Sequence, residues 1–344
     1  MSIKLKKTLK IILKVALILF LIVSFNLLMM PKYIETLQDG RVIPEFYREK
    51  IDNDVVFVGS STVYSGVCPP TLYKEYGITS FIRATSSQTS WITYDIIRET
   101  LERSKPKLVV IDIGFMKEID DYAEEVSNRK AFDYMKWSAA KIEGINLSKA
   151  AEENMWDYVI PVLRYHGRWN QLKFEDFKYL YYKPDVTYNG YIMDVNTSAS
   201  LDNKMEVFEG EEQLLTPRNE EYLRKSIELC KAHGVEVLLI KVPSYQPKWG
   251  DMLEEQYNRI ADEYDIEYID YNKRENELNI DYLAESPDAG SHLNAYGAVR
   301  FSKVLGKDIK DLFSVPDNRV NETVSHIWNK KLERFENDFE NRTN

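Results

Sequence analysis

Cysteine and histidine are scarce in this chain of 344 residues, which contains two cysteines and four histidines. Cys68 and Cys230 cannot form a disulfide framework or a four-ligand zinc site, and they leave open one bridge or two free thiols. No cluster of His, Cys, Asp or Glu has the spacing of metal ligands, and no glycine-rich phosphate loop follows the first predicted strand. We therefore expect no metal ion and no cofactor.

Basic residues are outnumbered by acidic ones. The net charge is −10, although residues 1–30 carry five lysines and no acidic residue, so the rest of the chain is strongly acidic. Proteins bind a phosphate backbone mainly through Lys and Arg, which argues against a nucleic-acid partner. A content of 29% charged and 12% aromatic residues excludes a disordered chain. The length allows two domains, or one large domain with an insertion.

A long apolar run lies near the N-terminus. Seventeen of the twenty residues from Ile11 to Met30 are apolar. At about 1.5 Å per residue the run spans about 30 Å, which is enough to cross a bilayer. The lysines precede the run, so the positive-inside rule places the body outside the cytoplasm. A cleaved signal peptide is the alternative, but residues 29–33 contain no small-x-small cleavage pattern.

The rest of the chain alternates between short apolar runs and helical patterns. The β-branched runs predict buried strands at residues 54–59, 79–83, 107–112, 235–241 and 266–269. Helical segments separate these strands, as in residues 218–233, which end at Gly234. The alternation predicts an α/β fold, a three-layer α/β/α doubly wound parallel sheet.

The expected organisation has six parts. They are a cytoplasmic basic tail (1–10), a transmembrane helix (11–30), a stalk (31–53), a core in two pieces (54–117 and 218–316), a mostly helical, aromatic-rich insertion (118–217) and an amphipathic C-terminal helix (317–344). The insertion holds 16 of the 43 aromatic residues, so it forms either a cap over a site or a subdomain with its own core.

Two segments carry candidate chemistry. Ser61 follows the first predicted strand directly, and ligands of open α/β sheets bind beyond the carboxyl ends of the strands. His292 lies beside Asp288 on a loop before a strongly periodic helix. A serine nucleophile needs an imidazole to take its proton, and the imidazole needs a carboxylate to fix its tautomer. These residues therefore predict a Ser-His-Asp site.

Together the two segments resemble the SGNH/GDSL hydrolase superfamily, over about residues 54–116 and 218–313. The resemblance implies a flavodoxin-like fold, with Ser61 as nucleophile, His292 as general base and Ser60 in place of the family's Asp. The Gly-Ser-Ser sequence and the extension from His292 through Leu and Asn to Gly-Ala look like a membrane-anchored branch associated with O-acylation of cell-envelope polysaccharides.

The chain departs from the family pattern at the acid. The usual position, three residues before the histidine, is Ala289, and Asp288 lies four before it. Gly290 would let the loop bulge to compensate, or Glu285 would serve instead.

The oxyanion hole departs as well. Ala84 replaces the family's glycine, and the third strand ends in Asp112-Ile-Gly114 without the family's asparagine. The hole would then rest on the backbone amides of Ser61 and Ala84, with Gln88 as a further donor.

Substrate binding is assigned to Tyr64 and to three residues of the insertion, His166, Arg168 and Trp169. An imidazole, a guanidinium and an aromatic ring are side chains that contact sugars. The alternative is that this aromatic segment belongs to the core of the insertion.

These observations predict a membrane-anchored, extracytoplasmic serine esterase or O-acyltransferase, with acetyl as the acyl group and a cell-envelope glycan as substrate. Transfer would require a polytopic membrane O-acyltransferase as partner, because donors such as acetyl-CoA are cytoplasmic. The alternative is a non-catalytic glycan-binding or scaffold protein that keeps the fold.

Overall fold

A five-stranded parallel sheet forms the centre of the body. The computed structural model describes residues 3–34, 37–114, 116, 124–201, 214–245 and 251–343. The strands, in the order β2-β1-β3-β4-β5, are β1 (Val55–Gly59), β2 (Ser80–Ala84), β3 (Leu108–Asp112), β4 (Glu236–Lys241) and β5 (Glu267–Asp270). Each predicted strand is confirmed to within one residue at either end, and so is the doubly wound fold.

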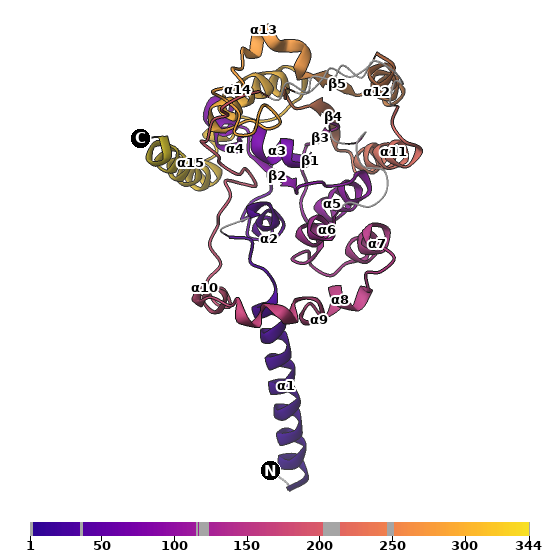
Figure 1. Ribbon diagram of the computed structural model, residues 1–344, viewed down its shortest axis with the longest axis vertical. Helices are drawn as coiled ribbons and strands as arrows, with labels where there is room; N and C mark the ends of the chain where they lie inside the picture. The colour runs from indigo at the N-terminus through magenta and orange to yellow at the C-terminus, as the bar shows by residue number, and fades with distance from the viewer. Residues whose placement is uncertain are drawn as a thin grey trace.

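Helices cover both faces of this sheet (Figure 1). Val56 and Val58 of β1 pack with one set, whose bounds are α5 (Ser90–Arg103), α11 (Pro217–Ala232) and α12 (Asp251–Tyr264). Val55 and Phe57 point the opposite way, toward α3 (Ser61–Gly66), α4 (Pro69–Tyr76) and α14 (Ala295–Leu312). Successive strand residues face opposite sides, so a fully apolar strand is buried by two helical layers. Cys68 and Cys230 are both buried and unbridged.

Short helices fill much of the segment predicted as an insertion. They are α6 (Glu125–Phe132), α7 (Ala139–Ser148), α8 (Met155–Val159), α9 (Val162–Tyr165), the 3-10 helix η2 (His166–Asn170) and α10 (Phe174–Lys178). Residues 118–123 and 202–213 of this segment lie outside the described residues.

The chain returns to the sheet after α10. The Ile82 amide donates to the Asn189 carbonyl at 2.9 Å, and the Ile192 amide donates to the Tyr64 carbonyl at 2.8 Å. A Cβ on Gly190 would lie 2.3 Å from the Ile82 carbonyl oxygen, so only glycine allows this approach. The end of the insertion therefore belongs to the core beside α3.

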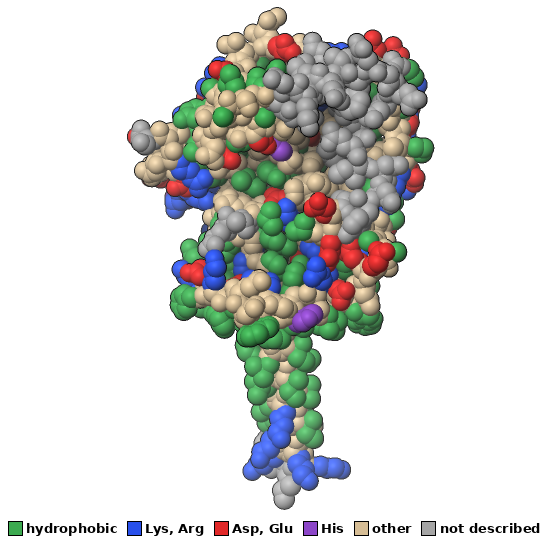
Figure 2. Space-filling model, in the orientation of Figure 1, with side chains coloured by type: hydrophobic (Ala, Val, Ile, Leu, Met, Phe, Trp, Pro, Cys, Tyr) green, Lys and Arg blue, Asp and Glu red, His purple; other side chains and the backbone are tan. Residues whose placement is uncertain are grey.

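A single long helix, α1 (Ile3–Met29), projects from the opposite pole of the body to α13 (Figure 1). It is apolar and long enough to cross a membrane, and its most apolar stretch is not buried in the body. Figure 2 shows hydrophobic side chains along its length and lysines at its free end. The structure thus contains the helix expected of a membrane anchor.

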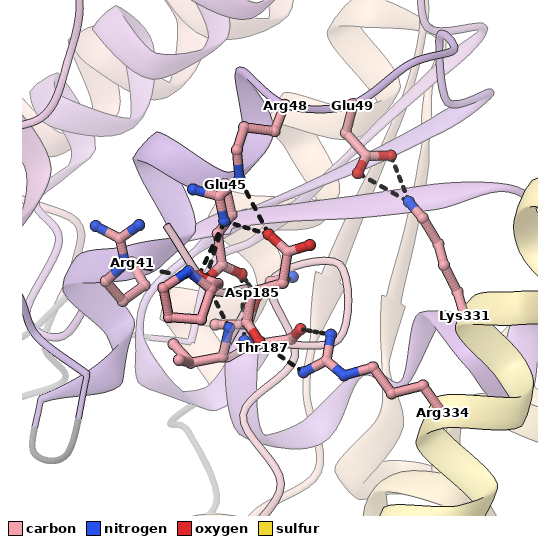
Figure 3. Close-up of polar contacts among 11 residues, drawn as sticks. Arg41, Glu45, Arg48, Glu49, Asp185, Thr187, Lys331 and Arg334 are labelled. Carbon is pink, nitrogen blue, oxygen red and sulfur yellow. Dashed lines mark hydrogen bonds and ion pairs between the residues drawn. The ribbon is translucent and has the colours of Figure 1, made fainter. Parts of the chain in front are cut away.

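The segment expected to be a stalk is packed into the body instead. It forms the 3-10 helix η1 (Gln38–Arg41) and α2 (Val42–Phe46), whose apolar side chains are buried. Figure 3 shows the polar network around the buried Glu45, which accepts hydrogen bonds from the Thr187 hydroxyl and the Val186 amide. Lys331 pairs with Glu49 at 2.7 Å in the same region. The network joins the N-terminal segment, the end of the insertion and the C-terminal helix.

The remaining elements follow the last strands. They are the 3-10 helix η3 (Tyr271–Arg274), α13 (Glu275–Leu278), the 3-10 helix η4 (Asn318–Val320) and α15 (Glu322–Thr343). Trp328 of α15 stacks on Tyr73 of α4 with ring centroids 5.2 Å apart, and Phe335 is also buried. The C-terminal helix is thus amphipathic and packed on the body.

Candidate active site

The turn between β1 and α3 presents Ser61 at the carboxyl edge of the sheet. The strand ends at Gly59, and Ser61 is the first residue of α3. A Cβ on Gly59 would lie 2.9 Å from the Cβ of Asp112 and 2.7 Å from Val63, so the turn requires glycine. Ser61 therefore occupies the edge where doubly wound folds bind their ligands.

Ser61, His292 and Asp288 form a continuous chain of hydrogen bonds. The Oγ of Ser61 lies 2.7 Å from the Nε2 of His292. On the other side of the ring, Nδ1 lies 2.5 Å from Oδ2 of Asp288. The His292 backbone amide also donates to Asp288 Oδ1 at 2.9 Å. The geometry is that of a nucleophile, a base and an orienting acid.

The extra residue between acid and histidine is absorbed by a left-handed bulge. Ala289 and Gly290 have φ values of 60° and 96°. A Cβ on Gly290 would come within 2.2 Å of Tyr245, so this position requires glycine in two ways. The bulge brings the Asp288 carboxylate back to the ring, and the chain achieves a four-residue spacing where the family pattern has three.

Glu285, the alternative acid, is used elsewhere. Both of its oxygens accept hydrogen bonds from Arg300, at 2.7 to 3.0 Å. Burial alone raises the pKa of Asp288, but the hydrogen bonds from the His292 ring and amide outweigh it and lower this pKa below the ordinary value. Asp288 is therefore the ionised partner of the imidazole.

Three polar side chains that the sequence analysis did not single out hold the His292 loop in place. The Ser286 hydroxyl accepts from the Gly290 amide at 2.8 Å. Ser198, from the end of the insertion, accepts from the Ala289 amide at 2.9 Å. Asn294 caps α14 by accepting from the Tyr296 amide at 3.0 Å. Asn294 belongs to the His-Leu-Asn motif and could have been recognised, whereas nothing local marks Ser198.

A buried carboxylate supports the helix that carries Ser61. Asp112, at the end of β3, is fully buried and accepts from the Thr62 hydroxyl at 2.6 Å. It also accepts from the amides of Gly114 and Val242, both at 3.2 Å. Burial raises the pKa of Asp112, and these hydrogen bonds offset the rise only in part. Asp112 thereby ties the first turn of α3 to two strands of the sheet.

The loop after β2 contains the predicted oxyanion donors. Ala84 ends β2 and is paired with Gly59 across the sheet, so its backbone lies beside the Ser61 turn. Gln88 is buried, and its carboxamide accepts from the Thr85 amide at 3.1 Å and donates to Thr93 at 3.0 Å. These contacts hold the Gln88 side chain within its own loop, and its role as an oxyanion donor stays a prediction.

Tyr64 lies one turn after Ser61 on α3. Burial raises the pKa of Tyr64, and the negative charges of Asp39 and Asp288 add to the rise. The structure thus brings this predicted substrate-binding residue to the same place as Ser61 and His292.

The other predicted substrate-binding residues lie at the end of the body that adjoins α1, away from α3. His166, Arg168 and Trp169 belong to η2, which contacts α1. Figure 1 shows α9 and α10, on either side of η2, at the junction with α1 and well away from α3. Arg168 donates to the Met29 carbonyl at 2.6 Å, and Trp169 is 71% exposed. The structure therefore does not bring these three residues to the Ser61 site, and their contact with a sugar stays a prediction.

In the described residues, no three His, Cys, Asp or Glu side chains are grouped so that they could hold a metal ion. The side chains of His292 and Asp288 are 28% and 46% exposed, so the site is accessible from solvent.

Comparisons with known proteins give only distant likenesses. No protein-family model and no curated protein matches the chain. Among solved structures, the chain is similar to a candidate acylhydrolase from Bacteroides fragilis (15% identity, 82% of this chain and 99% of that chain, TM-score 0.38). It is also similar to a candidate lipolytic protein of the G-D-S-L family from Desulfitobacterium hafniense (12% identity, 74% of this chain and 99% of that chain, TM-score 0.36). A mutant acetyl-xylooligosaccharide esterase from Geobacillus is similar at 13% identity over 76% of this chain and 96% of that chain, with a TM-score of 0.33.

Proposed function

We propose that this chain is a serine esterase or O-acyltransferase, anchored in the membrane by α1, that acts on an acylated cell-envelope glycan outside the cytoplasm. The observation that carries the proposal is the hydrogen-bonded chain from Ser61 through His292 to Asp288. Ser61 lies far from Asp288 and His292 in the sequence. The imidazole of His292 nevertheless lies within hydrogen-bond distance of both the serine hydroxyl and the carboxylate, as its role as a base requires.

The geometry supports acyl transfer in two steps. His292 Nε2 removes the proton of Ser61 as Oγ attacks the ester carbonyl, and Asp288 stabilises the imidazolium that forms. The tetrahedral intermediate then collapses, and the imidazolium gives its proton to the departing alcohol. Water or a sugar hydroxyl, deprotonated by His292, attacks the acyl-enzyme and regenerates Ser61. Hydrolysis and transfer differ only in this acceptor.

Backbone amides would stabilise the oxyanion. Ser61 starts α3, and amides in the first turn of a helix have no acceptor within the helix. Together with the Ala84 amide, the Ser61 amide forms our proposed oxyanion hole. Removing one such donor from an enzyme lowers the rate by about 10²–10³-fold, so the loss of either amide from this pair would lower the rate strongly.

Location and substrate rest on the sequence features. The lysines before the apolar stretch of α1 favour a cytoplasmic N-terminus and an external body. The Gly-Ser-Ser and His-Leu-Asn sequences support an envelope glycan as substrate and acetyl as the acyl group, through the resemblance stated above. For transfer, a polytopic membrane protein would supply acyl groups from the cytoplasm.

The test is covalent labelling of the full chain in detergent with a fluorophosphonate serine probe. We expect the wild type to be labelled, and Ser61→Ala and His292→Ala to remain unlabelled. Ser314→Ala and His326→Ala, which change an exposed serine and an exposed histidine elsewhere, serve as matched controls and should label like the wild type. A folded wild type that does not react would support the non-catalytic glycan-binding alternative.

The acceptor is tested separately with an acetyl ester and an added envelope glycan. Hydrolysis predicts release of acetate whether or not the glycan is present. Transfer predicts acetylated glycan at the expense of acetate. Both products must disappear in Ser61→Ala.

A further inference from the structure

The base of the body exposes many large apolar side chains. Nine residues between α8 and the chain just after α10 are 41–77% exposed; we call them the base face, and they are Trp156, Val159, Leu163, Trp169, Phe174, Phe177, Leu180, Tyr181 and Tyr182. Figure 1 shows α8, α9 and α10 in a row across the end of α1, and Figure 2 shows hydrophobic side chains along this rim of the body. An exposed apolar patch of this size marks a contact surface.

Two hydrogen bonds fix the height of the base face relative to α1. The Val162 amide donates to the Asn26 side chain at 3.0 Å, and Arg168 donates to the Met29 carbonyl at 2.6 Å. The apolar run ends at Met30, so Asn26 lies about 6 Å before its end, at 1.5 Å per residue. When α1 spans a bilayer, α9 and η2 are therefore held at the boundary between hydrocarbon and headgroups.

The joint between α1 and the body does not act as a free hinge. Met29 and Met30 are buried. The ammonium group of Lys32 donates to the Met30 carbonyl at 2.5 Å and pairs with Asp176 at 3.6 Å, and Asp176 also accepts from Arg168 at 3.1 Å. A cation at the last carbonyls stabilises a helix C-terminus. The base face thus keeps a fixed orientation around the emerging helix.

The composition of the segment fits a lipid surface. Four of the nine exposed side chains are Trp or Tyr, whose amphipathic rings concentrate at membrane interfaces. Residues 155–183 contain five Lys or Arg and three Asp or Glu, whereas the chain as a whole is acidic. Excess positive charge favours anionic headgroups.

We propose that α8, η2 and α10 rest on the outer surface of the bilayer, with the base face inserted among the lipid headgroups. The inference rests on the proposed anchoring by α1, and it adds a second membrane contact that fixes how the body stands on the membrane. The occupant of the base face is lipid, because the contacts with Asn26 and Met29 place it at the depth where lipid headgroups lie.

The experiment uses single cysteines that carry a nitroxide spin label, in the full chain reconstituted into vesicles of phosphatidylcholine and phosphatidylglycerol. Native Cys68 and Cys230 are fully buried, so the introduced thiols react selectively. Trp169→Cys and Phe174→Cys probe the base face. Leu17→Cys probes the exposed surface of α1, and Leu283→Cys probes an exposed apolar position just beyond α13, at the far pole. Collision rates with oxygen and with a water-soluble nickel chelate report the depth of each label.

We expect labels at positions 169 and 174 to collide with the nickel chelate several-fold less, and with oxygen more, than the label at 283. If they match position 283 while the label at 17 is in hydrocarbon, the surface contact is overturned and the anchor stands. If the label at 17 is also in water, the proposed anchoring itself fails. Shielding of 169 and 174 from both reagents would mean that protein, a second copy or a partner, covers the base face, and would overturn lipid as its occupant.

Discussion

Two regions of the body each carry a histidine among polar and aromatic residues, yet only one of them places its histidine between a serine and an acid. His292 meets Ser61, which lies 231 positions away in the chain, at 2.7 Å. His166 is exposed, and its Nδ1 lies 2.9 Å from the carbonyl of Leu163, within its own turn. A histidine becomes a base when the fold brings it a proton donor and an acid from elsewhere, and local composition does not reveal this.

The aromatic residues of these two regions also differ in how exposed they are. At the carboxyl edge of the sheet, Tyr64 is partly buried beside the triad, whereas Trp169 at the base is 71% exposed. Trp169 is therefore not part of a core of the insertion, whereas its contact with a sugar stays a prediction. In the membrane contact proposed above, this exposed indole, next to α1, lies among the lipid headgroups.

Substitution of Asp288, the acid beside His292, is the strongest test of the difference between the two histidines. We predict that Asp288→Asn lowers kcat for an ester substrate by about 10³–10⁴-fold, because the imidazole loses both its orientation and the charge that stabilises the imidazolium. The matched variant Glu285→Gln should keep kcat within about tenfold, since Glu285 pairs with Arg300 and not with His292. Steady-state kinetics of both variants provide the measurement. A larger loss in Glu285→Gln than in Asp288→Asn would reassign the acid.

A smaller effect is expected where the hydroxyl of Thr62 meets Asp112. Thr62→Val removes the donor from a fully buried carboxylate and loosens the first turn of α3. We expect the free energy of unfolding to fall by about 1–3 kcal/mol. Misplacement of Ser61 should lower kcat by about tenfold or more, because a displacement of 1 Å costs up to 10² in rate.

Thr71→Val is the control for this effect. Thr71, on α4, is also buried, but its hydroxyl donates to the sulfur of Cys68, just before α4 and away from the triad. Urea unfolding and turnover, measured on both variants, separate stability from positioning. Equal losses of kcat in the two variants would show that Thr62 acts on stability alone.

Asp288 and Asp95 show how partners decide the state of an acid. Asp95 on α5 is buried, and neither of its oxygens has a hydrogen-bond partner within the described part of the chain. Burial, with a smaller effect of Glu143, raises the pKa of Asp95 to about 8. Because the folded state holds this proton more tightly than the unfolded chain, the stability of the wild type falls as the pH rises from about 4 to about 8.

Asp95→Asn should remove this pH dependence. We expect the variant to be more stable than the wild type by about 1–3 kcal/mol above pH 8, and nearly as stable as the wild type at pH 5. Above pH 8 the wild type must either bury the ionised carboxylate of Asp95 or expose it to water. Thermal melting at the two pH values measures the difference. A wild type that is equally stable at both would indicate that Asp95 has a partner when ionised.

The sequence predicted what depends on local pattern. Val55–Gly59 and Leu108–Asp112 are unbroken apolar runs that end in Gly and Asp, so the strands and the edge that carries Ser61 could be located. The shift of Asp288 by one residue was also recognised, because Gly290 allowed a bulge. The contacts of Ser198 with Ala289 and of Thr62 with Asp112 could not be foreseen, since each joins residues 50 or more positions apart.

The smallest expected effect completes the comparison. His166→Ala removes an exposed ring whose described hydrogen-bond contact is with its own turn, and exposed substitutions of this kind change free energies by about 0.5 kcal/mol or less. We therefore predict that kcat/KM stays within about twofold of the wild type, and that the serine probe labels the variant fully, while His292→Ala abolishes both. Measured side by side in the full chain, the two alanine variants differ only in which of the two regions they alter. A loss in His166→Ala that approached the loss in His292→Ala would mean that the base of the body takes part in the reaction. The proposed division between a reactive region around Ser61 and a membrane-facing base would then have to be abandoned.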